Sequence, residues 1–530
     1  MSDNRYDVIV VGYGPVGQIA ANLLGQAGMR VAVYETATGI YDLPRAVGFD
    51  AEIMRVFQSV GLAEAILPST TPIKGYDFVT GDGEKLFGFD PPQPPTFSGW
   101  ASNYMFYQPE LEAALRSGVE RFSSVQVHTG HEVIDIRQND SGVEVDVREL
   151  STEAESTVSA DYVIGCDGGR SITRKIVGTG LEDLNFNQPW LVIDVMLKRD
   201  VDLPDHATQI CEPTRPTTFI PSRGNHRRWE FMLMPGDDPE SISSTDRVWE
   251  LLSPWIGSGD ADVIRAVVYT FHALIADRWR DRRVLLAGDA AHQMPPFLGQ
   301  GMCSGIRDAA NLAWKLDLVC RGSASDALLD TYQLERSPHV RAITERAMHL
   351  GSIIQTSDPE IAKVRDERFR SAPGRRFTID DDTGPLKQRL PGLNAGVIDR
   401  VSDDSRVGQL FPQGLVALPD GDEALLDDVI GQRFAIVVAE EAASSNPQPA
   451  FGVASFISPA LITLTSSETG ASDGWTRVAD RTGVVTEWLN GAIAVVRPDR
   501  YVYGIASNVG ELSALTGSLR QQLLRTEAHV

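Results

Sequence analysis

The chain has few cysteines, and none of them is paired by spacing. Its 530 residues hold only Cys166, Cys211, Cys303 and Cys320, with no CxxC pair and no metal-finger spacing. The pattern therefore predicts free buried thiols, and it offers no candidate metal site.

Long apolar runs and an excess of positive charge are also missing. No run approaches the roughly 18 to 20 apolar residues of a membrane span, and the first residues, MSDNRYD, lack the basic region of a secretory signal. Lys plus Arg number 48 against 72 Asp plus Glu, and a formal charge of −24 repels nucleic acid and anionic membranes. We therefore expect a cytoplasmic protein that binds neither nucleic acid nor membrane. A small anionic substrate would need arginines close to its site.

The chain is longer than a single hydrophobic core usually supports, so we expect two or three domains. Residues 6–35 are typical of a βαβ unit, and a helix is predicted from Pro109 to Arg116. Residues 185–270 are mostly strand and turn, which indicates a β-rich insertion in an α/β domain. After about Leu390 the character changes again, with a hairpin predicted in AIAVVRPDRYVYGIA and a surface loop at 440–450.

A glycine-rich turn stands directly after the first strand. In GYGPVG, Gly12 permits the tight turn, Gly14 lets a pyrophosphate approach the backbone, and Gly17 lets helix and strand pack closely. The helix N-terminus attracts the phosphate charge, and Glu35 at the end of the next strand can accept hydrogen bonds from ribose hydroxyls. These features predict a bound dinucleotide, but they do not separate FAD from NAD.

Two further turns follow apolar strands. CDGGRSITRK (166–175) alone is an ordinary strand followed by an Asp-Gly turn. In the segment 288–316, Asp289 is placed to bind a ribityl hydroxyl, and the residues from Pro296 to Met302 lead into a helix whose amides can face a flavin carbonyl. The apolar stripe of that helix is Ile306, Ala309, Ala310 and Ala313. His292 is predicted to support the loop, because no second ligand stands at metal spacing beside it.

At these three turns the sequence resembles the class A flavoprotein monooxygenases, whose dinucleotide fingerprint, DG motif and GD motif occur in this order. Segments that are similar to the 3-(3-hydroxyphenyl)propionate hydroxylase subfamily are residues 44–62, 211–216, 227–236 and 328–339. The resemblance spans essentially the whole chain. It is weakest over 380–530, which is similar to the thioredoxin-like tail of many such enzymes. That tail has no cysteine, which excludes thiol redox chemistry there.

The resemblance implies an α/β fold: a Rossmann-like FAD-binding domain, an inserted β-rich substrate domain as in p-hydroxybenzoate hydroxylase, and a C-terminal thioredoxin-like domain. We expect the FAD-binding domain, with a helical extension, in residues 1–70, 100–184 and 271–385. The substrate domain would take 71–99 and 185–270, and the C-terminal domain 390–530.

The resemblance also implies an activity. FAD, with NADH or NADPH as transient co-substrate and O₂, would hydroxylate a small phenol ortho to its hydroxyl through a flavin C4a-hydroperoxide. The implied substrate is 3-(3-hydroxyphenyl)propionate or a related meta-substituted phenol. A hydroxylase of polycyclic phenols, a non-hydroxylating FAD/NAD reductase, a nicotinamide dehydrogenase and a non-enzymatic sensor stay open, as does a homodimer. A flavin absorbance spectrum and an oxidation assay with and without a phenol separate these classes.

By resemblance, Arg45 and Gln108 contact the flavin, and Arg116 is a weaker candidate. The full set predicted to bind the cofactor is Gly12, Gly14, Pro15, Val16, Gly17, Glu35, Thr36, Arg45, Gln108, Arg116, Asp167, Gly168, Gly288, Asp289, Pro296, Gly299, Gln300, Gly301 and Met302.

Catalysis on a phenol benefits from a base that takes its proton. Asp50 is the acid available near the flavin loop, although Val47 stands where some relatives place an acid or a histidine. Pro295 and Pro296 of the GD loop complete the predicted catalytic set.

A substrate carboxylate needs a cationic partner. The arginine in the β-rich insertion that we would test first is Arg215, with Arg228 and His206 behind it. Met294 and Phe297 are predicted to line the apolar wall over the substrate ring.

Overall fold

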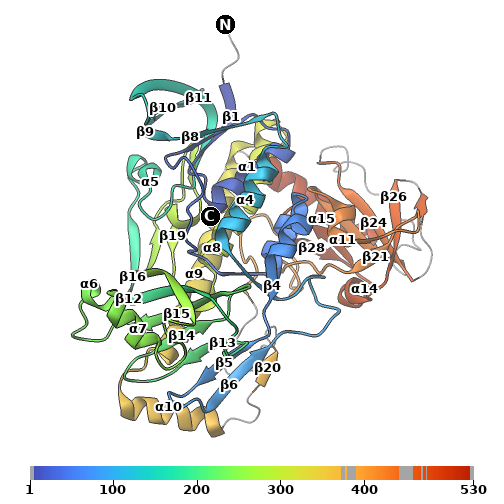
Figure 1. Cartoon of the computed structure of the whole chain (residues 1–530). Helices are drawn as coiled ribbons and strands as arrows, with labels where there is room; N and C mark the ends of the chain where they lie inside the picture. The colour runs from blue at the N-terminus through green and yellow to red at the C-terminus, as the bar shows by residue number, and fades with distance from the viewer. Residues whose placement is uncertain are drawn as a thin grey trace.

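A computed structural model of the chain describes residues 5–371, 376–378, 390–440, 457–466, 470–472 and 474–525. These residues form three large sheets with their own helices and one small sheet of β3 (Gly48–Asp50), β7 (Asn103–Phe106) and β4 (Thr70–Pro72) (Figure 1). The predicted loop at 440–450 lies outside the described residues apart from Glu440.

The first sheet contains the predicted βαβ unit, which is confirmed. β1 pairs in parallel with both β2 and β11, so the carboxyl ends of β1 and β11 meet at one edge of the sheet. The strands of this sheet are β17 (Arg280–Asp281), β18 (Val284–Leu286), β11 (Ala154–Gly165), β1 (Arg5–Val11), β2 (Val31–Glu35) and β8 (Val125–Thr129), with β10 (Gly142–Glu149) and β9 (His131–Asn139) beside β11. Its helices are α1 (Pro15–Gln26), α2 (Ala51–Ser59), α3 (Ala63–Ile66), α4 (Gln108–Val119) and α5 (Ile172–Ile176).

The predicted β-rich insertion forms most of a second sheet. In spatial order its strands are β19 (His292–Gln293), β16 (Ala261–Ala276), β12 (Leu181–Leu197), β15 (His226–Met232), β14 (Thr217–Ile220), β13 (Ala207–Ile210), β5 (Tyr76–Val79), β6 (Lys85–Asp90) and β20 (Arg376–Thr378). Two short helices, α6 (Pro239–Ile242) and α7 (Thr245–Leu252), interrupt the insertion and were not predicted. Asp238 starts α6 by accepting a hydrogen bond from the Ser241 amide.

The third sheet has the predicted thioredoxin-like arrangement. β23 and β24 are parallel, and the predicted hairpin of β27 and β28 continues the sheet antiparallel to β23. Its strands are β22 (Glu423–Leu425), β21 (Leu415–Ala417), β26 (Trp475–Asp480), β24 (Ala460–Thr465), β23 (Ala435–Ala439), β27 (Ile493–Val496) and β28 (Val502–Ala506), with β25 (Gly470–Ser472) beside β26. Its helices are α11 (Leu426–Ile430), α14 (Val484–Leu489) and α15 (Val509–Leu524).

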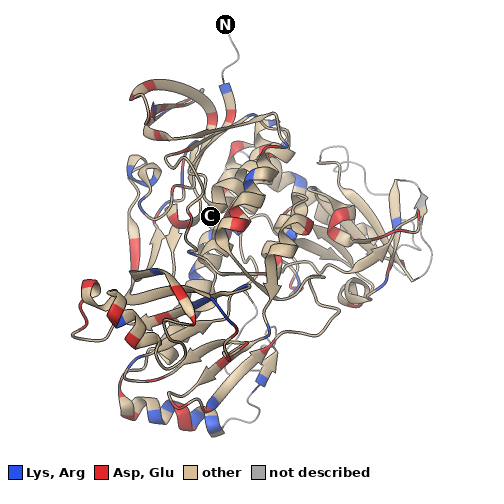
Figure 2. Cartoon of the chain, viewed as in Figure 1, with Lys and Arg blue, Asp and Glu red and all other residues tan. Residues whose placement is uncertain are grey.

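Two long helices, α8 (Gly301–Cys320) and α9 (Asp330–Ile354), run through the middle of the molecule (Figure 1). The predicted apolar stripe of α8 is confirmed, because Ile306, Ala309 and Ala313 are buried and Ala310 is partly buried. α8 lies close to α1, since a Cβ on Gly305 would approach Val16 Cγ2 to 2.6 Å. α9 continues toward α10 (Pro359–Ser371), where basic and acidic side chains alternate (Figure 2).

The described cysteines are free, as predicted: Cys211 and Cys303 are buried, and Cys166 and Cys320 are partly buried. Among the helices that the structure describes, none is long and apolar enough to cross a membrane.

A buried charge cluster joins the third sheet to α8 and α9. Glu335 on α9 accepts from Lys315 Nζ at 2.8 Å and from Arg497 Nη2 at 2.7 Å, and all three side chains are fully buried. Asp499 in turn accepts from Arg497 Nη2 at 2.6 Å. Because an unpaired charge is costly away from water, each of these groups requires the others.

We predict that Glu335→Gln lowers the free energy of unfolding by about 3 to 5 kcal/mol, because buried Lys315 loses its anion and buried Arg497 keeps only Asp499. Glu423→Gln is the matched control: its pair with Arg481 is half-exposed, so the loss should stay below about 1 kcal/mol. Urea unfolding measures both. Similar losses for the two variants would contradict the prediction.

The same cluster predicts an acid limit of stability. Burial would raise the pKa of Glu335, but Arg497 and Lys315 outweigh it and lower the pKa from 4.5 to about 2. The stabilisation is therefore complete above the unfolded value of 4.5 and is lost as pH falls from there toward 2. In Glu335→Gln, this part of the acid dependence of unfolding should be absent.

Candidate active site

The glycine turn after β1 borders open space. Gly14 is the N-cap of α1, and no side chain caps the N-terminal amides of the helix. A Cβ on Gly14 would meet no atom within 4 Å, whereas one on Gly17 would lie 2.0 Å from the Gly12 carbonyl oxygen. Gly17 thus packs against the turn, while Gly14 and the free amides leave room and donors for a pyrophosphate.

Glu35 and Arg116 lie beside this turn. Glu35 accepts hydrogen bonds from the Tyr13 amide at 2.7 Å and the Ala37 amide at 2.8 Å. The Arg116 guanidinium lies 5.0 Å from the centre of the Tyr13 ring and donates to the Gly39 carbonyl. Both predicted residues therefore border the glycine turn.

The DG turn is held by its own aspartate. Asp167 accepts from the Ser171 hydroxyl at 2.6 Å and from the amide and hydroxyl of Thr173 at 2.9 and 3.0 Å. Gly168 has a φ of +75°, and a Cβ there would meet no atom within 4 Å. The glycine, more than the carboxylate, borders open space.

In the GD motif the aspartate itself is open. The Asp289 side chain is accessible and accepts no hydrogen bond from the described part of the chain. Desolvation by the surrounding protein raises its pKa, and His292, Arg45 and Arg174 oppose that rise. The Asp289 carboxylate is therefore open to a hydroxyl-bearing ligand.

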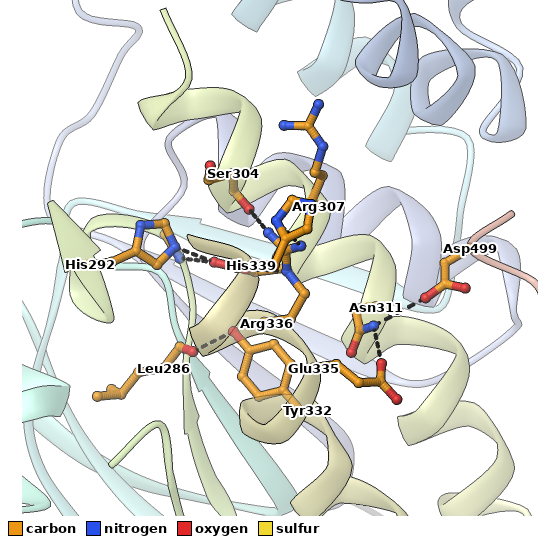
Figure 3. A network of polar contacts seen from close by, with 12 residues as sticks. Leu286, His292, Ser304, Arg307, Asn311, Tyr332, Glu335, Arg336, His339 and Asp499 are labelled. Carbon is orange, nitrogen blue, oxygen red and sulfur yellow. Dashed lines mark hydrogen bonds and ion pairs between the residues drawn. The ribbon is translucent and has the colours of Figure 1, made fainter. Parts of the chain in front are cut away.

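Asp308 on α8 fixes the GD loop from behind. It accepts from the Gly288 amide at 3.0 Å, His292 Nε2 at 2.6 Å and Arg336 Nε at 2.9 Å. Figure 3 shows Arg336 between His339 and Ser304, to both of which it also donates. The supporting role predicted for His292 is confirmed, and the described residues contain no group able to hold a metal ion.

Two arginines bind backbone near the three turns. Arg174, which sequence reasoning missed, donates to the Gly169 carbonyl at 2.7 Å and the Ala290 carbonyl at 3.0 Å, so it ties the DG turn to the GD turn. Arg228 donates to the Arg45 carbonyl at 2.8 Å and is also paired with Asp194.

Gln108 holds the same segment from the other side. Its Oε1 accepts from the amides of Arg45 at 2.9 Å and Ala46 at 2.8 Å. Gln108 and Arg228 therefore fix the backbone, while the Arg45 side chain stays exposed.

A cavity of about 810 Å³ lies where the three sheets meet. It brings together three of the predicted site residues, Asp50, Phe297 and Gln300. The cavity wall also includes Glu52, Tyr76, Phe78, Phe89, Gln209, Arg346, Leu350, Arg406, Leu410, Trp488 and Tyr501. Tyr76 and Gln209 could not have been found from a motif, since each lies in a short strand without one.

Asp50 has a structural task in this cavity. Its Oδ1 accepts from the amides of Glu52 and Ile53 and so caps α2. Its Oδ2 accepts from Gln300 Nε2 at 2.9 Å and Arg307 Nη2 at 2.5 Å. These four donors use both oxygens, so proton abstraction by Asp50 stays a prediction.

The remaining predicted residues do not line the cavity. Arg215 is paired with Asp237, and His206 Nδ1 lies 2.7 Å from Asp205 Oδ1. Met294 packs against the core of the first sheet. Pro295 is the N-cap of the short 3₁₀ turn Pro296–Leu298, which contains Phe297.

These openings fit FAD. Gly14 and Gly168 leave space beside the strand ends, Asp289 offers an unpartnered acceptor, and α8 begins at Gly301 without a side-chain cap and without an atom within 4 Å of a Cβ there. The fold and this site define an FAD-binding oxidoreductase.

The FAD binding domain family matches residues 5–347, and the HcaD C-terminal domain family matches 408–522. The probable NADH-specific resorcinol 4-hydroxylase of Rhodococcus jostii (strain RHA1) is 41% identical, over 97% of this chain and 94% of that protein. A 3-(3-hydroxy-phenyl)propionate/3-hydroxycinnamic acid hydroxylase of Mycolicibacterium smegmatis is 37% identical, over 98% and 94%. The chain therefore belongs to the FAD binding domain family, among its FAD-dependent aromatic hydroxylases.

Solved structures share the fold. The flavin-dependent monooxygenase PieE, in complex with FAD and substrate, gives a TM-score of 0.80 at 21% identity over 99% of this chain and 100% of that one. Aklavinone-11 hydroxylase with FAD and aklavinone gives 0.77 at 22% identity over the same shares. At these identities the likeness shows the fold alone.

We predict that Gly14→Val abolishes FAD binding without unfolding the protein, because the new side chain fills the space left for a pyrophosphate. Gly17→Ala should instead destabilise the apoprotein, since its Cβ meets the Gly12 carbonyl. Flavin absorbance relative to protein absorbance and thermal unfolding of the apoprotein measure the two effects. Full flavin content in Gly14→Val would remove this turn from the site.

A second prediction contrasts two aspartates. Asp289→Asn should weaken FAD binding by about 1.5 to 3 kcal/mol, roughly ten- to a hundredfold, and leave apoprotein stability unchanged. Asp308→Asn, which disturbs three buried partners, should lower the free energy of unfolding by about 3 kcal/mol or more. Equilibrium flavin titration and urea unfolding check both. Unchanged affinity in Asp289→Asn would exclude Asp289 from FAD binding.

Proposed function

We propose that this chain uses NADH and O₂ to hydroxylate a small meta-substituted phenol, such as resorcinol or 3-(3-hydroxyphenyl)propionate, ortho to its hydroxyl. The observation that carries the proposal is the aromatic-lined cavity at the N-terminus of α8, beside the FAD openings. The names of relatives at 41% and 37% identity support the substrate class and the choice of NADH.

Bound FAD would supply the redox chemistry with NADH and O₂. The residues of the chain would bind and orient the substrate ring and shield it from water. Phe78 and Phe89 of the second sheet, Phe297 of the GD loop and Leu350 of α9 give the cavity apolar walls. These walls offer an aromatic ring an apolar surface.

Polar donors for the phenol hydroxyls come from the floor of the cavity. Gln209 pairs with Phe78 across β13 and β5, and Tyr76 lies two residues before Phe78, so all three side chains share one face of the sheet. The Thr218 hydroxyl donates to Gln209 Oε1 at 2.6 Å, which leaves Nε2 directed away from that bond. Burial raises the pKa of Tyr76, with Asp50 adding to the rise, so its hydroxyl stays a donor.

A substrate carboxylate would find two arginines on the described cavity wall, Arg346 and Arg406. Arg406 is paired with Asp404 and donates to the carbonyls at the end of α14. We infer that Arg346 of α9 recognises the carboxylate, because it lies one helical turn before Leu350 on the face of α9 that lines the cavity. Arg215 and Arg228, the candidates from the sequence, are bound to Asp237 and Asp194.

One observation favours a second candidate, a hydroxylase of a larger polycyclic phenol. The volume of about 810 Å³ lies high in the range of about 300 to 1,000 Å³ that holds drug-sized ligands, and it exceeds the need of a single ring. A substrate panel that includes such phenols separates the two.

We further propose that the protein works in the cytoplasm, where NADH is supplied and four unpaired cysteines stay reduced. We also propose the domain boundaries predicted from the sequence and a homodimer. Limited proteolysis tests the boundaries, and light scattering measures the oligomeric state.

NADH oxidation by the purified protein should rise severalfold when resorcinol or 3-(3-hydroxyphenyl)propionate is added, with a product that carries one more oxygen. Product must be measured by chromatography, because uncoupled peroxide release also consumes NADH. A product only from polycyclic phenols would favour the second candidate, and no product from any phenol would overturn the proposal.

In the same assay, Arg346→Met should raise the KM for the propionate by about ten- to a hundredfold, the worth of a charged hydrogen bond, and barely change the KM for resorcinol. Arg215→Ala is the comparison variant, and it should change neither value. An equal rise in both KM values for Arg346→Met would show a general loss of structure.

A further inference from the structure

A tyrosine of the third sheet contacts α2, a helix of the first sheet, which carries the predicted FAD-binding turns. Tyr501 lies between β27 and β28, is 5% exposed, and donates from its hydroxyl to Glu52 Oε1 at 2.9 Å. Glu52 belongs to α2 of the first sheet. Burial, and then Glu52 itself, raise the pKa of Tyr501 well above its usual value, so the hydroxyl is a donor.

From Glu52 the contacts lead to the N-terminus of α8. Glu52 Oε2 accepts from Arg307 Nε at 2.6 Å, and Arg307 donates to Asp50 Oδ2 at 2.5 Å and to Gln300 Oε1 at 2.8 Å. Gln300 is the N-cap residue of α8 and also donates to Asp50 at 2.9 Å. The network therefore ends at the helix start that opens toward FAD and at the carboxylate that lines the cavity.

The position of Glu52 in this network depends on its hydrogen bond from Tyr501. Each oxygen of Glu52 has one described side-chain partner, Tyr501 for Oε1 and Arg307 for Oε2. Without the hydroxyl, Oε1 would lose its described side-chain donor, and the carboxylate would gain by turning toward another donor. Such a turn pulls on Arg307 and, through it, on Asp50 and Gln300.

The bond also stands between two cavities. Glu52, Leu410 and Tyr501 line both the cavity of about 810 Å³ and a second one of about 310 Å³ between α8 and the hairpin turn. The hydrogen bond from Tyr501 to Glu52 is part of the partition, so movement there changes the wall of the active-site cavity directly.

We propose that Tyr501 is a positioning residue for the hydroxylation: through Glu52 and Arg307, the C-terminal sheet fixes the start of α8 and Asp50. The inference rests on the proposed function for its effect on turnover, but the predicted ordering of α8 can be measured without substrate or FAD.

The test compares Tyr501→Phe with Tyr503→Phe in the full chain. Tyr503 is its matched control, because it is buried two residues later, its hydroxyl bonds to Ser518 and Gln522 of α15, and it lines neither cavity. Tyr501→Phe should speed amide exchange over residues 296–304 of the apoprotein and reduce kcat for product by about tenfold, with a larger share of NADH uncoupled. Tyr503→Phe should do neither.

Each outcome decides the proposal. Unchanged exchange at 296–304 in Tyr501→Phe would overturn it, even if turnover fell. Equal effects of the two variants would also overturn it, because they would reflect general stability. If Tyr501→Phe does not fold, Glu52→Gln replaces it, since it keeps an acceptor for Tyr501 but weakens the pair with Arg307, and it must speed the same exchange. If no phenol is hydroxylated by the wild type, the proposed function fails while the exchange result still decides the role of Tyr501.

Discussion

Buried charge along α8 is the constraint on which the rest of the structure depends. Arg307, Asp308, Asn311 and Lys315 follow one another on this helix, and none is more than 2% exposed. An ionised group held away from water must find opposite charge and hydrogen bonds, or it destabilises the fold by several kcal/mol, on the order of 3 to 5. The partners come from α2, the GD loop, α9 and the hairpin turn of the third sheet, so the buried pairs favour this arrangement of the elements around α8.

The same pairing shows where a ligand belongs. Asp167 and Asp308 accept from several protein donors, whereas the Asp289 carboxylate and the first amides of α1 and α8 have no side-chain partner among the described residues. Open polar groups that stand beside glycines with free space are the positions where we propose that FAD binds. Glycines stand at those positions because a side chain would occupy the volume that the cofactor needs.

Local features were predictable from the sequence, and pairings between distant segments were not. The turn at Gly12, the βαβ unit and the stripe of α8 each depend on neighbouring residues. Tyr501 and Glu52 are 449 residues apart, and a search for apolar periodicity does not register a buried arginine such as Arg307. Asp50 could be identified as an acid near the flavin loop, but not as an acceptor of four hydrogen bonds. For the same reason, the ion pair between Arg215 and Asp237 could not be predicted when Arg215 was proposed to bind the substrate.

The C-terminal sheet shows why a domain without cysteine can still matter to the chemistry. Apolar packing alone could attach a domain to its neighbour without buried charges. A buried ion pair across the contact also fixes the geometry, because the two charges must stay in hydrogen-bond distance. Here the segment from Arg497 to Tyr501 supplies a cation for Glu335, an anion for Asn311 and a hydroxyl for Glu52. Each partner lies on a helix that forms a wall of the cavity or holds the GD loop. The orientation of this sheet is thereby coupled to the geometry of the site, and a shift of the hairpin turn would be transmitted to α8.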